Sequence, residues 1–362
     1  MTTAAFTYDA LPGRVVFGPG RRREIADEVD RVGAARVVLV ADAQAKPTGD
    51  ELAATLGSRV ARRWDEVAQH VPVDLAERAR SAATEAGADG VVCIGGGSST
   101  GLAKALALSH EIPIVAVPTT YAGSEMTPIY GLTGGRHKQT GRDLRVLPKV
   151  VVYDPELTLG LPPSVTGPSA CNALAHCVEA LYASGANPVT SAMALEGVRA
   201  IHRALPTVMA TPDDLAARSE LLYGAYLAGV SLGTTSTGLH HKLCHVLGGM
   251  FGLVHADTHS VVLPHAVAFN APALPDEMRR LATALGANPG DAAGALWDLA
   301  VASRVPTSLA ELGLTEDDLA PAAERAAGEI TDNPVPVDAA GLVGILRRAY
   351  AGARPEAVGR AG

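Results

Sequence analysis

The sequence predicts two domains: an α/β domain with a parallel, Rossmann-like sheet over residues 1–160, and an all-α domain over residues 161–362. Three observations support this. A chain of 362 residues is too long for one comfortable core. Short β-branched runs alternate with amphipathic helical patterns up to about residue 154. Beyond Pro162 strand-like runs become rare, and Ala/Leu-rich segments with a 3.6-residue period replace them.

The elements of the first domain follow from short apolar runs that end in turn residues. Such runs, buried on both faces of a parallel sheet, predict strands at 14–17, 37–40, 90–94, 112–117 and 150–153. Amphipathic periodicity predicts helices at 21–32 and 74–86, with a further helix after residue 97. In the second domain the same periodicity predicts helices at 168–183, 188–204, 213–232 and 275–285.

Composition narrows the class of protein. Hydrophobic residues make up 48% and charged residues 19% of the chain, and the net charge of −8 argues against nucleic acid or an anionic membrane as a partner. The four cysteines form no CxxC pair and sit in apolar segments, which predicts reduced, buried thiols. The N-terminal segment lacks the pattern of a signal peptide, and no apolar run is long enough to span a bilayer. A cytoplasmic protein is therefore expected.

A glycine-rich turn follows the predicted strand 90–94 and opens the next helix. Gly95, Gly96 and Gly97 would let peptide N–H groups approach a diphosphate, and Ser98 and Ser99 add hydroxyl donors. The spacing is not GxGxxG, so a standard dinucleotide fingerprint is absent. Because tight strand-to-helix turns also need glycine, a purely structural turn is the alternative.

Polar residues follow two neighbouring predicted strands. Asp42 lies at the end of one strand, where its carboxylate could bond a ribose diol and favour NADH over NADPH. A solvated Asp at a strand end is nearly as good an interpretation. Thr119, Thr120 and Ser124 follow another strand end, and ligands bind at the carboxyl edge of parallel sheets. These loops are therefore expected to face one nucleotide.

Histidines concentrate in the second domain. Five of the eleven fall between residues 240 and 259, namely His240, His241, His245, His255 and His259. Two of them, His241 and His245, are four apart and would share one helix face. The glycine pair at 248–249 is expected to end this helix, and the turn after residue 252 would bring His255 back towards it.

A second polar pair lies upstream, where Asn172 and His176 are also four apart on an apolar helix. Two helices, each with a polar pair at helical spacing, are what a metal or substrate site needs. The alternative is that buried histidines merely bond backbone carbonyls, which is the weaker interpretation for so many in one segment.

A basic stretch lies between most of the predicted sheet and the predicted helical domain in this otherwise acidic chain. Lys138 and Arg142 are four apart, and arginine suits bidentate binding of a carboxylate. The Thr140-Gly141 pair favours a hairpin-like loop over a helix. A solvated basic loop is the alternative. Lys242, beside His241, is a further cation whose side chain could point away from the histidines.

Taken together, these motifs resemble the iron-containing (group III) alcohol dehydrogenase superfamily along nearly the whole chain. The matching segments are 17–20, 95–98, 118–120, 154–155, 172–179, 241–255 and 333–334. The resemblance implies a dehydroquinate synthase-like fold that binds NAD(P)H, with the active site in a cleft between the domains. Metal ligands in that superfamily would fall at Asn172, His176, His241 and His255.

Asn172 departs from the superfamily pattern, which has an aspartate there. The amide removes a formal charge and the hardest ligand from a divalent site. Segments 95–104, 121–127 and 172–179 resemble the maleylacetate reductase branch. That resemblance implies NAD(P)H-dependent reduction of the carbon–carbon double bond of a dicarboxylate enone, maleylacetate, to 3-oxoadipate in the degradation of aromatic compounds. It also implies a homodimer.

The chemistry of such a reaction tolerates a metal-free site, because hydride addition to an enone leaves an enolate that hydrogen-bond donors can stabilise. We therefore expect no bound metal, with His176, His241 and His255 binding substrate oxygens or the enolate. His245 is the first candidate for the proton donor and Tyr121 the alternative. Asn172 would orient its neighbour, while His259 and His265 are expected to be structural. The rival hypothesis is a metal-dependent alcohol or aldehyde dehydrogenase of the same superfamily.

Overall fold

The computed structural model describes residues 5–134 and 137–357. The chain divides into two compact units. The sheet unit is Ala10–Leu161, and the helical unit is Pro162–Gly362 together with the segment that precedes Ala10.

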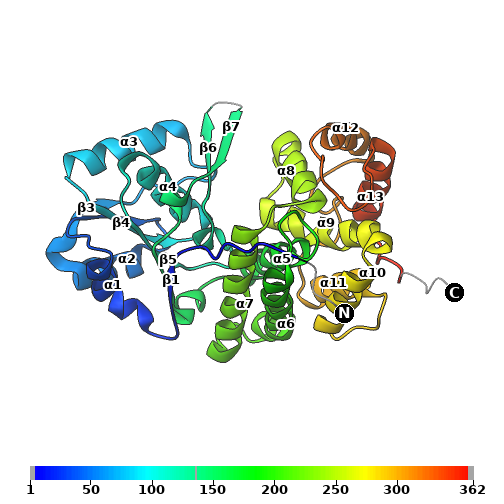
Figure 1. The fold of residues 1–362 in the computed structure, drawn as a ribbon, viewed down its shortest axis with the longest axis horizontal. Coiled ribbons are helices and arrows are strands. Elements are labelled where there is room, and N and C mark those ends of the chain that lie inside the picture. The colour runs from blue at the N-terminus through cyan, green and yellow to red at the C-terminus, as the bar shows by residue number, and fades with distance from the viewer. Residues whose placement is uncertain (1–4, 135–136, 358–362) are drawn as a thin grey trace. The chain divides into compact units, whose positions relative to one another are not determined.

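The sheet unit is built on six parallel strands in the order β1-β8-β5-β4-β2-β3 (Figure 1). The strands are β1 Arg14–Phe17, β2 Val37–Ala41, β3 Val60–Trp64, β4 Gly90–Gly95, β5 Ile114–Pro118 and β8 Val150–Tyr153. The central strands are buried along their whole length, as expected for a sheet covered on both faces. This confirms the predicted parallel α/β fold, whereas β3 is an edge strand that the sequence pattern did not reveal.

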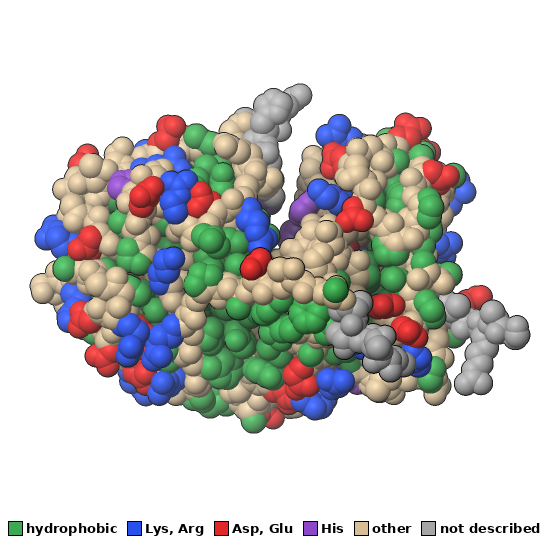
Figure 2. Space-filling model, in the orientation of Figure 1, with side chains coloured by type: hydrophobic (Ala, Val, Ile, Leu, Met, Phe, Trp, Pro, Cys, Tyr) green, Lys and Arg blue, Asp and Glu red, His purple; other side chains and the backbone are tan. Residues whose placement is uncertain are grey.

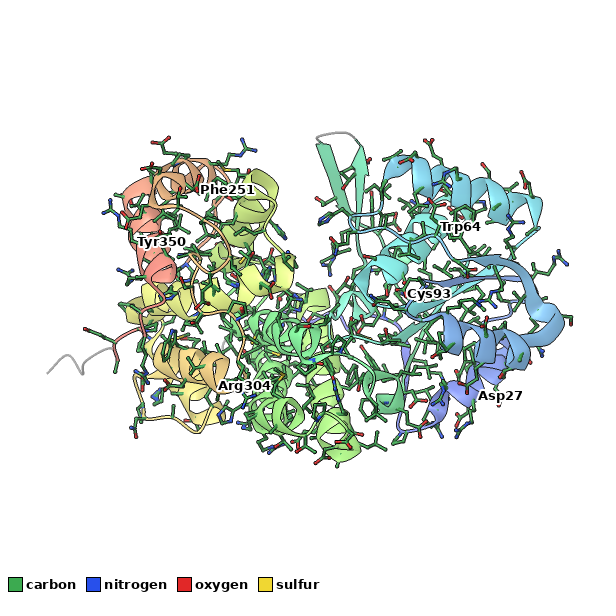
Figure 3. The ribbon with its side chains drawn as sticks, turned by 180° about the vertical axis from the view of Figure 1, so that it is seen from behind. Asp27, Trp64, Cys93, Phe251, Arg304 and Tyr350 are labelled. Atoms are coloured by element: carbon green, nitrogen blue, oxygen red, sulfur yellow. The ribbon has the colours of Figure 1, made fainter. Side chains whose placement is uncertain are left out.

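Helices cover both faces of this sheet, and they are α1 Ile25–Arg31, α2 Lys46–Leu56, α3 Val73–Glu85 and α4 Gly97–His110. One face packs against α1 and α2 through a core that includes Ile25, Leu52 and Leu39. The other face packs against α4, beside α3 (Figure 1). Cys93 of β4 lies within the unit (Figure 3), and burial raises the pKa of its thiol to about 12. All four cysteines are free and buried, as predicted.

A separate two-stranded antiparallel sheet joins β6 Ile129–Gly134 to β7 His137–Arg142. It carries the basic stretch, so the predicted hairpin-like arrangement is present. Outside this hairpin the surface of the sheet unit intersperses basic and acidic side chains (Figure 2), and several form exposed ion pairs such as Arg59 with Asp30. Exposed pairs of this kind contribute little to stability.

The helical unit confirms the predicted all-α second half. Its helices are α5 Pro163–Glu179, α6 Pro188–Ala210, α7 Leu215–Thr234, α8 Leu239–Phe251, α9 His255–Asn270, α10 Pro275–Ala284, α11 Ala292–Ala302, α12 Glu316–Ala327 and α13 Ala339–Ala351. A core of α8, α9, α12 and α13 side chains is closed at its margin by Phe251 and Tyr350 (Figure 3). Within the described ranges, no helix is long and apolar enough to cross a membrane.

Several predicted helix ends differ from the structure: α5 begins and ends earlier than predicted, α6 continues to Ala210, and the predicted end of α8 is wrong. The Gly248-Gly249 pair does not end α8, which continues to Phe251 and stops at Gly252, whose φ of 70° is left-handed. Each helical glycine costs about 1 kcal/mol relative to alanine. Burial of Val246 and Leu247 in the core on the preceding turn holds the helix together across the pair.

Candidate active site

Three polar side chains point from one helix into the interior of the helical unit. Asn172, His176 and Glu179 occupy α5 at helical spacing and are only 7%, 6% and 1% exposed. Alanine, leucine, cysteine and valine fill the positions between them, so the helix is buried all round and these polar groups must find partners inside.

Imidazoles from α8 and α9 meet this helix. The His176 ring stacks on the His241 ring with centroids 4.9 Å apart, and His259 lies 4.6 Å from His241. The exposed rings of His245 and His255 stack at 5.8 Å. Because His255 is also 4.1 Å from His259, the histidines form one cluster that runs from the surface to the interior.

A buried carboxylate organises the start of α8. Glu179 accepts hydrogen bonds from the peptide N–H groups of Gly238 at 3.0 Å and His240 at 2.8 Å. Its other contact is with Nδ1 of His241, at 2.5 Å. Since the peptide donors favour a carboxylate, we assign the Nδ1–H tautomer to His241, which leaves the lone pair on Nε2. Burial raises the pKa of the Glu179 carboxyl, while His240 and the peptide donors partly offset that rise.

The buried imidazoles are neutral at physiological pH. Burial and repulsion between neighbouring rings lower the pKa of His240 and of His241 to about 3. The same two causes hold the pKa of His176 and of His259 well below its usual range. Neutral imidazoles both accept and donate hydrogen bonds, so the cluster can bind oxygen atoms or a cation without first losing protons.

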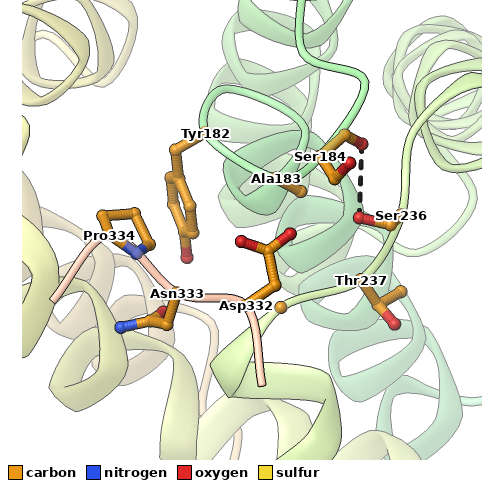
Figure 4. Close-up of a pocket in the computed structure, with 9 residues that line it drawn as sticks. Tyr182, Ala183, Ser184, Ser236, Thr237, Asp332, Asn333 and Pro334 are labelled. Atoms are coloured by element: carbon orange, nitrogen blue, oxygen red, sulfur yellow. Dashed lines mark hydrogen bonds between the residues drawn. The ribbon is translucent and has the colours of Figure 1, made fainter. Parts of the chain in front are cut away.

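A small pocket adjoins the loop that carries Gly238 (Figure 4). Its wall includes Tyr182, Asp332 and Asn333, and Ser236 donates a hydrogen bond to the carbonyl of Ser184 across one side. The Asn333 side chain exchanges amide hydrogen bonds with Asn270 at 2.7 and 3.0 Å, which fixes the segment after α12 to the end of α9.

The glycine loop of the sheet unit has the geometry expected of a close backbone approach. Gly95 has a φ of 138°, and a Cβ there would collide with the side chains of Ser99 and Asp42. The hydroxyl of Ser99 donates to Asp42 at 3.3 Å. Asp42 also accepts the N–H of Ala45 at 2.8 Å, so the carboxylate already supports this turn as well as facing the loop.

The second predicted loop lies beside the first. Gly95 and Pro118 are paired at the ends of β4 and β5, and the N–H of Thr119 donates to the carbonyl of Gly95 at 3.0 Å. A Cβ on Gly96 would approach the side chain of Thr120 at 3.2 Å. The structure therefore brings the predicted cofactor residues together, with Gly97 and Ser98 opening α4.

Lys104 of α4 ties these loops together, and sequence reasoning assigned it no role. Its ammonium is completely buried and donates to the carbonyls of Ser124 and Ile129, both at 2.7 Å, and to Thr127 Oγ1 at 3.0 Å. Burial lowers the pKa of Lys104 to about 7. Nearby, the buried Glu125 carboxyl accepts the hydroxyl of Tyr153 at 2.7 Å.

The other predicted site residues differ in how deeply they are buried. Tyr121 is completely buried in the sheet unit, and Arg142 is exposed at the end of β7. Lys242 is half-buried on α8, and the side chain of Lys138 lies outside the described residues. His259, expected to be structural, belongs to the ring cluster, whereas no ring contact is recorded for His265 among the described side chains.

In the orientations described, the positions that the family resemblance implies for a metal are not arranged around one point. Asn172 supplies a neutral amide, and the His176 and His241 rings are inclined by only 20°. Lone pairs lie in the ring planes, so nearly parallel stacked rings do not aim at one point. Among the described histidines, cysteines and carboxylates, no group that could hold a metal includes His176 or His255.

Comparison with known proteins covers both units. The family "Iron-containing alcohol dehydrogenase" matches residues 12–155, and "Fe-containing alcohol dehydrogenase family, C-terminal" matches residues 166–350. A maleylacetate reductase of Sphingobium indicum is 50% identical over 97% of this chain and 99% of its own length. Crystal structures of maleylacetate reductases from Agrobacterium tumefaciens and from Rhizobium sp. strain MTP-10005 each superpose with a TM-score of 0.94. Each is 45% identical over 97% of this chain, covering 100% and 99% of those chains.

Proposed function

This chain belongs to the iron-containing alcohol dehydrogenase family, and on that premise we propose that it reduces the carbon–carbon double bond of maleylacetate with NADH or NADPH, giving 3-oxoadipate. The observation that carries this proposal is the similarity to maleylacetate reductases along 97% of the chain. The buried, neutral imidazole cluster with Asn172 supports it, because this site suits a conjugate reduction better than an alcohol oxidation that requires a Lewis acid.

The chemical step is a hydride transfer followed by a protonation. A reduced nicotinamide cofactor held by the Gly95–Gly97 loop would supply the hydride for the alkene carbon β to the ketone, and the electron pair of the double bond would then form an enolate. Protonation of the carbon α to the ketone then gives the saturated oxo acid and oxidised cofactor. The protein must bind two carboxylates, stabilise the enolate oxygen and supply one proton.

The histidine cluster fits the last two tasks. Glu179 holds the His241 ring by its Nδ1–H, so Nε2 would present its lone pair to a substrate oxygen that carries a proton, while the neighbouring neutral His176 ring would donate its N–H to the enolate. The exposed His255 ring extends the same surface. We assign the proton donor to His245, whose ring is 6.3 Å from that of His241 and is exposed to solvent for reprotonation.

The sheet unit is the proposed cofactor domain and the helical unit the proposed catalytic domain. Gly95–Gly97, Ser98 and Ser99 would face the diphosphate at the N-terminus of α4. Asp42 would take the ribose diol, which favours NADH. Arg142 and Lys138 are proposed to bind a substrate carboxylate, and a homodimeric, cytoplasmic enzyme remains the expectation from the resemblance.

Metal independence is part of the proposal, because the family's ligand positions are not arranged around one point in the orientations described. The test is NADH oxidation with freshly generated maleylacetate and protein treated with EDTA. Rapid turnover supports a metal-independent reductase. Turnover that returns only with Fe²⁺ or Zn²⁺ would instead support the metal-dependent alternative with Asn172 at the site.

The proton donor has a separate test. His245→Asn should lower kcat by about 100-fold or more with a small change in KM, since general acid catalysis contributes on the order of 10²–10⁴. The matched control is His202→Asn, a half-buried histidine on α6 that takes part in no ring contact recorded for the cluster. Near-normal turnover of His245→Asn would show that His245 is not the proton donor, and Tyr121 would then be the candidate.

A further inference from the structure

Three imidazoles at the centre of the cluster form a triangle. His240 and His241 are neighbours on α8, and His259 comes from α9. Their ring centroids are 5.1 Å apart for the first pair, 4.7 Å for His240 and His259, and 4.6 Å for His241 and His259. His240 and His259 are completely buried, and His241 is 3% exposed.

Each of these rings has a nitrogen without a hydrogen-bond partner among the described atoms. His241 uses Nδ1 for Glu179, which leaves Nε2 unpaired. The Nε2 of His240 faces the carbonyl of His259 at 3.2 Å, which leaves Nδ1 unpaired. Neither ring nitrogen of His259 has a partner. Buried polar atoms are almost always satisfied, so four such nitrogens in three adjacent rings require an explanation.

We propose that His240, His241 and His259 form a binding site for one divalent transition-metal ion of the Zn²⁺ or Co²⁺ class. One ring nitrogen from each residue lies within 4.8 Å of the others. Zinc–imidazole bonds of about 2.0–2.1 Å in tetrahedral geometry place ring centroids roughly 5 Å apart. The observed separations match that value, so small ring rotations would bring the three lone pairs onto one ion.

The residues around the triangle suit a cation. Glu179 would carry the negative charge next to the ion and hold His241 by its Nδ1–H, the arrangement in which a carboxylate orients a metal-ligating histidine. The carbonyl of His259 fixes the ring of His240 in the same way. The stacked, exposed rings of His245 and His255 supply imidazoles along a route from solvent to His259.

This site differs from the one that the family resemblance implies. It shares only His241 with that set and uses neither Asn172 nor His176. Occupancy would take up Nε2 of His241, the atom proposed above to contact the substrate. The ion would therefore inhibit the reduction of maleylacetate. This inhibition rests on the proposed function, whereas binding of the ion does not.

The experiment titrates EDTA-treated protein with Co²⁺ and follows the visible d–d absorption of tetrahedral cobalt, with calorimetry for stoichiometry. We expect one ion per chain. His259→Gln and, independently, His240→Gln should weaken binding by at least about 100-fold, since even residues that only support a ligand change affinity by 10–100-fold. His265→Gln is the matched control, because His265 is equally buried on α9 and also has both ring nitrogens unpaired, yet lies outside the triangle.

Retention of the cobalt band in His265→Gln and His176→Gln, with its loss in both triangle variants, supports the proposal. No binding to the wild-type protein would overturn it. So would loss of binding in His176→Gln and His255→Gln together with normal binding in His259→Gln. Circular dichroism shows whether His259→Gln or His240→Gln fails to fold. If one of them does, cobalt binding by the other variant tests the site.

Failure of the proposed function and failure of the proposed metal site would give different results. If the metal-free protein does not reduce maleylacetate but binds Co²⁺ at the triangle, the site stands and the metal-independent function falls. If it turns over rapidly and binds no Co²⁺, the function stands and the site falls. When both hold, turnover should be lost in proportion to the growth of the cobalt band.

Discussion

Replacing the buried lysine of α4 tests how the two loops of the sheet unit are held. In Lys104→Met the side chain keeps most of its length but loses its ammonium. The carbonyl of Ile129 then loses the ammonium donor at 2.7 Å, whereas the carbonyl of Ser124, at the same distance from the ammonium, keeps hydrogen bonds from the N–H and the hydroxyl of Thr127. A buried acceptor left without a partner costs about 1–3 kcal/mol, so the variant should be less stable than the wild type at neutral pH by at least about 1 kcal/mol.

The sharper expectation concerns pH. Burial lowers the pKa of Lys104 from 10.5 to about 7 in the folded protein. Between these values the unfolded chain holds a proton that the folded chain has released, so the free energy of unfolding rises with pH. From about pH 7 to about pH 8.5 the rise amounts to about 1.6 kcal/mol. Lys104→Met has no such proton, so its deficit relative to wild type should grow by that amount.

Urea unfolding at the two pH values measures the deficit. Trp64 lies in the sheet unit and Trp297 in the helical unit, so a Trp297→Phe background lets fluorescence report on the unit that contains Lys104. Lys46→Met controls for the loss of an exposed lysine. A deficit that stays constant or shrinks between the two pH values would refute the reasoning.

Three further changes give equally direct expectations. In Glu179→Gln, one of the three buried donors would face the amide N–H₂ in place of a carboxylate oxygen. We expect the free energy of unfolding to fall by about 1–3 kcal/mol, and kcat/KM to fall 10–100-fold because His241 loses its orientation. Unchanged kinetics would contradict this expectation. Acid should destabilise the helical unit, because the pKa values of His240 and His241 are about 3 when folded and 6.5 otherwise. Stability is retained above about pH 6.5 and falls by about 2 kcal/mol for each histidine by pH 5, checked by urea unfolding across that range. Gly95→Ala should weaken NADH binding, measured by fluorescence titration, and cost about 1–3 kcal/mol through its strained φ, whereas Gly160→Ala, with no atom near its Cβ, should change neither.

Local patterns were enough to predict most of the fold. The strands β1 and β8 have the predicted bounds, because fully apolar runs between turn residues admit few alternatives. The edge strand β3 was missed since Arg62 and Arg63 interrupt its apolar pattern, and only one side of it pairs with a neighbour. The helix α2 was missed for a similar reason, because Pro47 and Gly49 weaken its helical signal.

For the candidate site, too, features within one helix could be predicted from the sequence, whereas contacts between distant segments could not. Spacing within one helix predicted that Asn172 and His176 share a face of α5, and the four-residue spacing of His255 and His259 is the corresponding signal in α9. Contacts between distant segments were not predictable. Nothing local links Lys104 to residue 129 or Glu179 to Gly238, since these contacts depend on how the elements pack.

The strand order of the sheet unit has a consequence for synthesis on the ribosome. The first strand, β1, pairs only with β8, the last strand of the sheet, so it leaves the exit tunnel on the order of ten seconds before its partner exists. Once β5 has been made, its apolar edge faces no neighbour for the few seconds that synthesis takes to reach β8, and unpaired apolar edges invite pairing with other chains. The nascent chain therefore passes through a stage in which chaperone access to β5 would govern the yield of native protein.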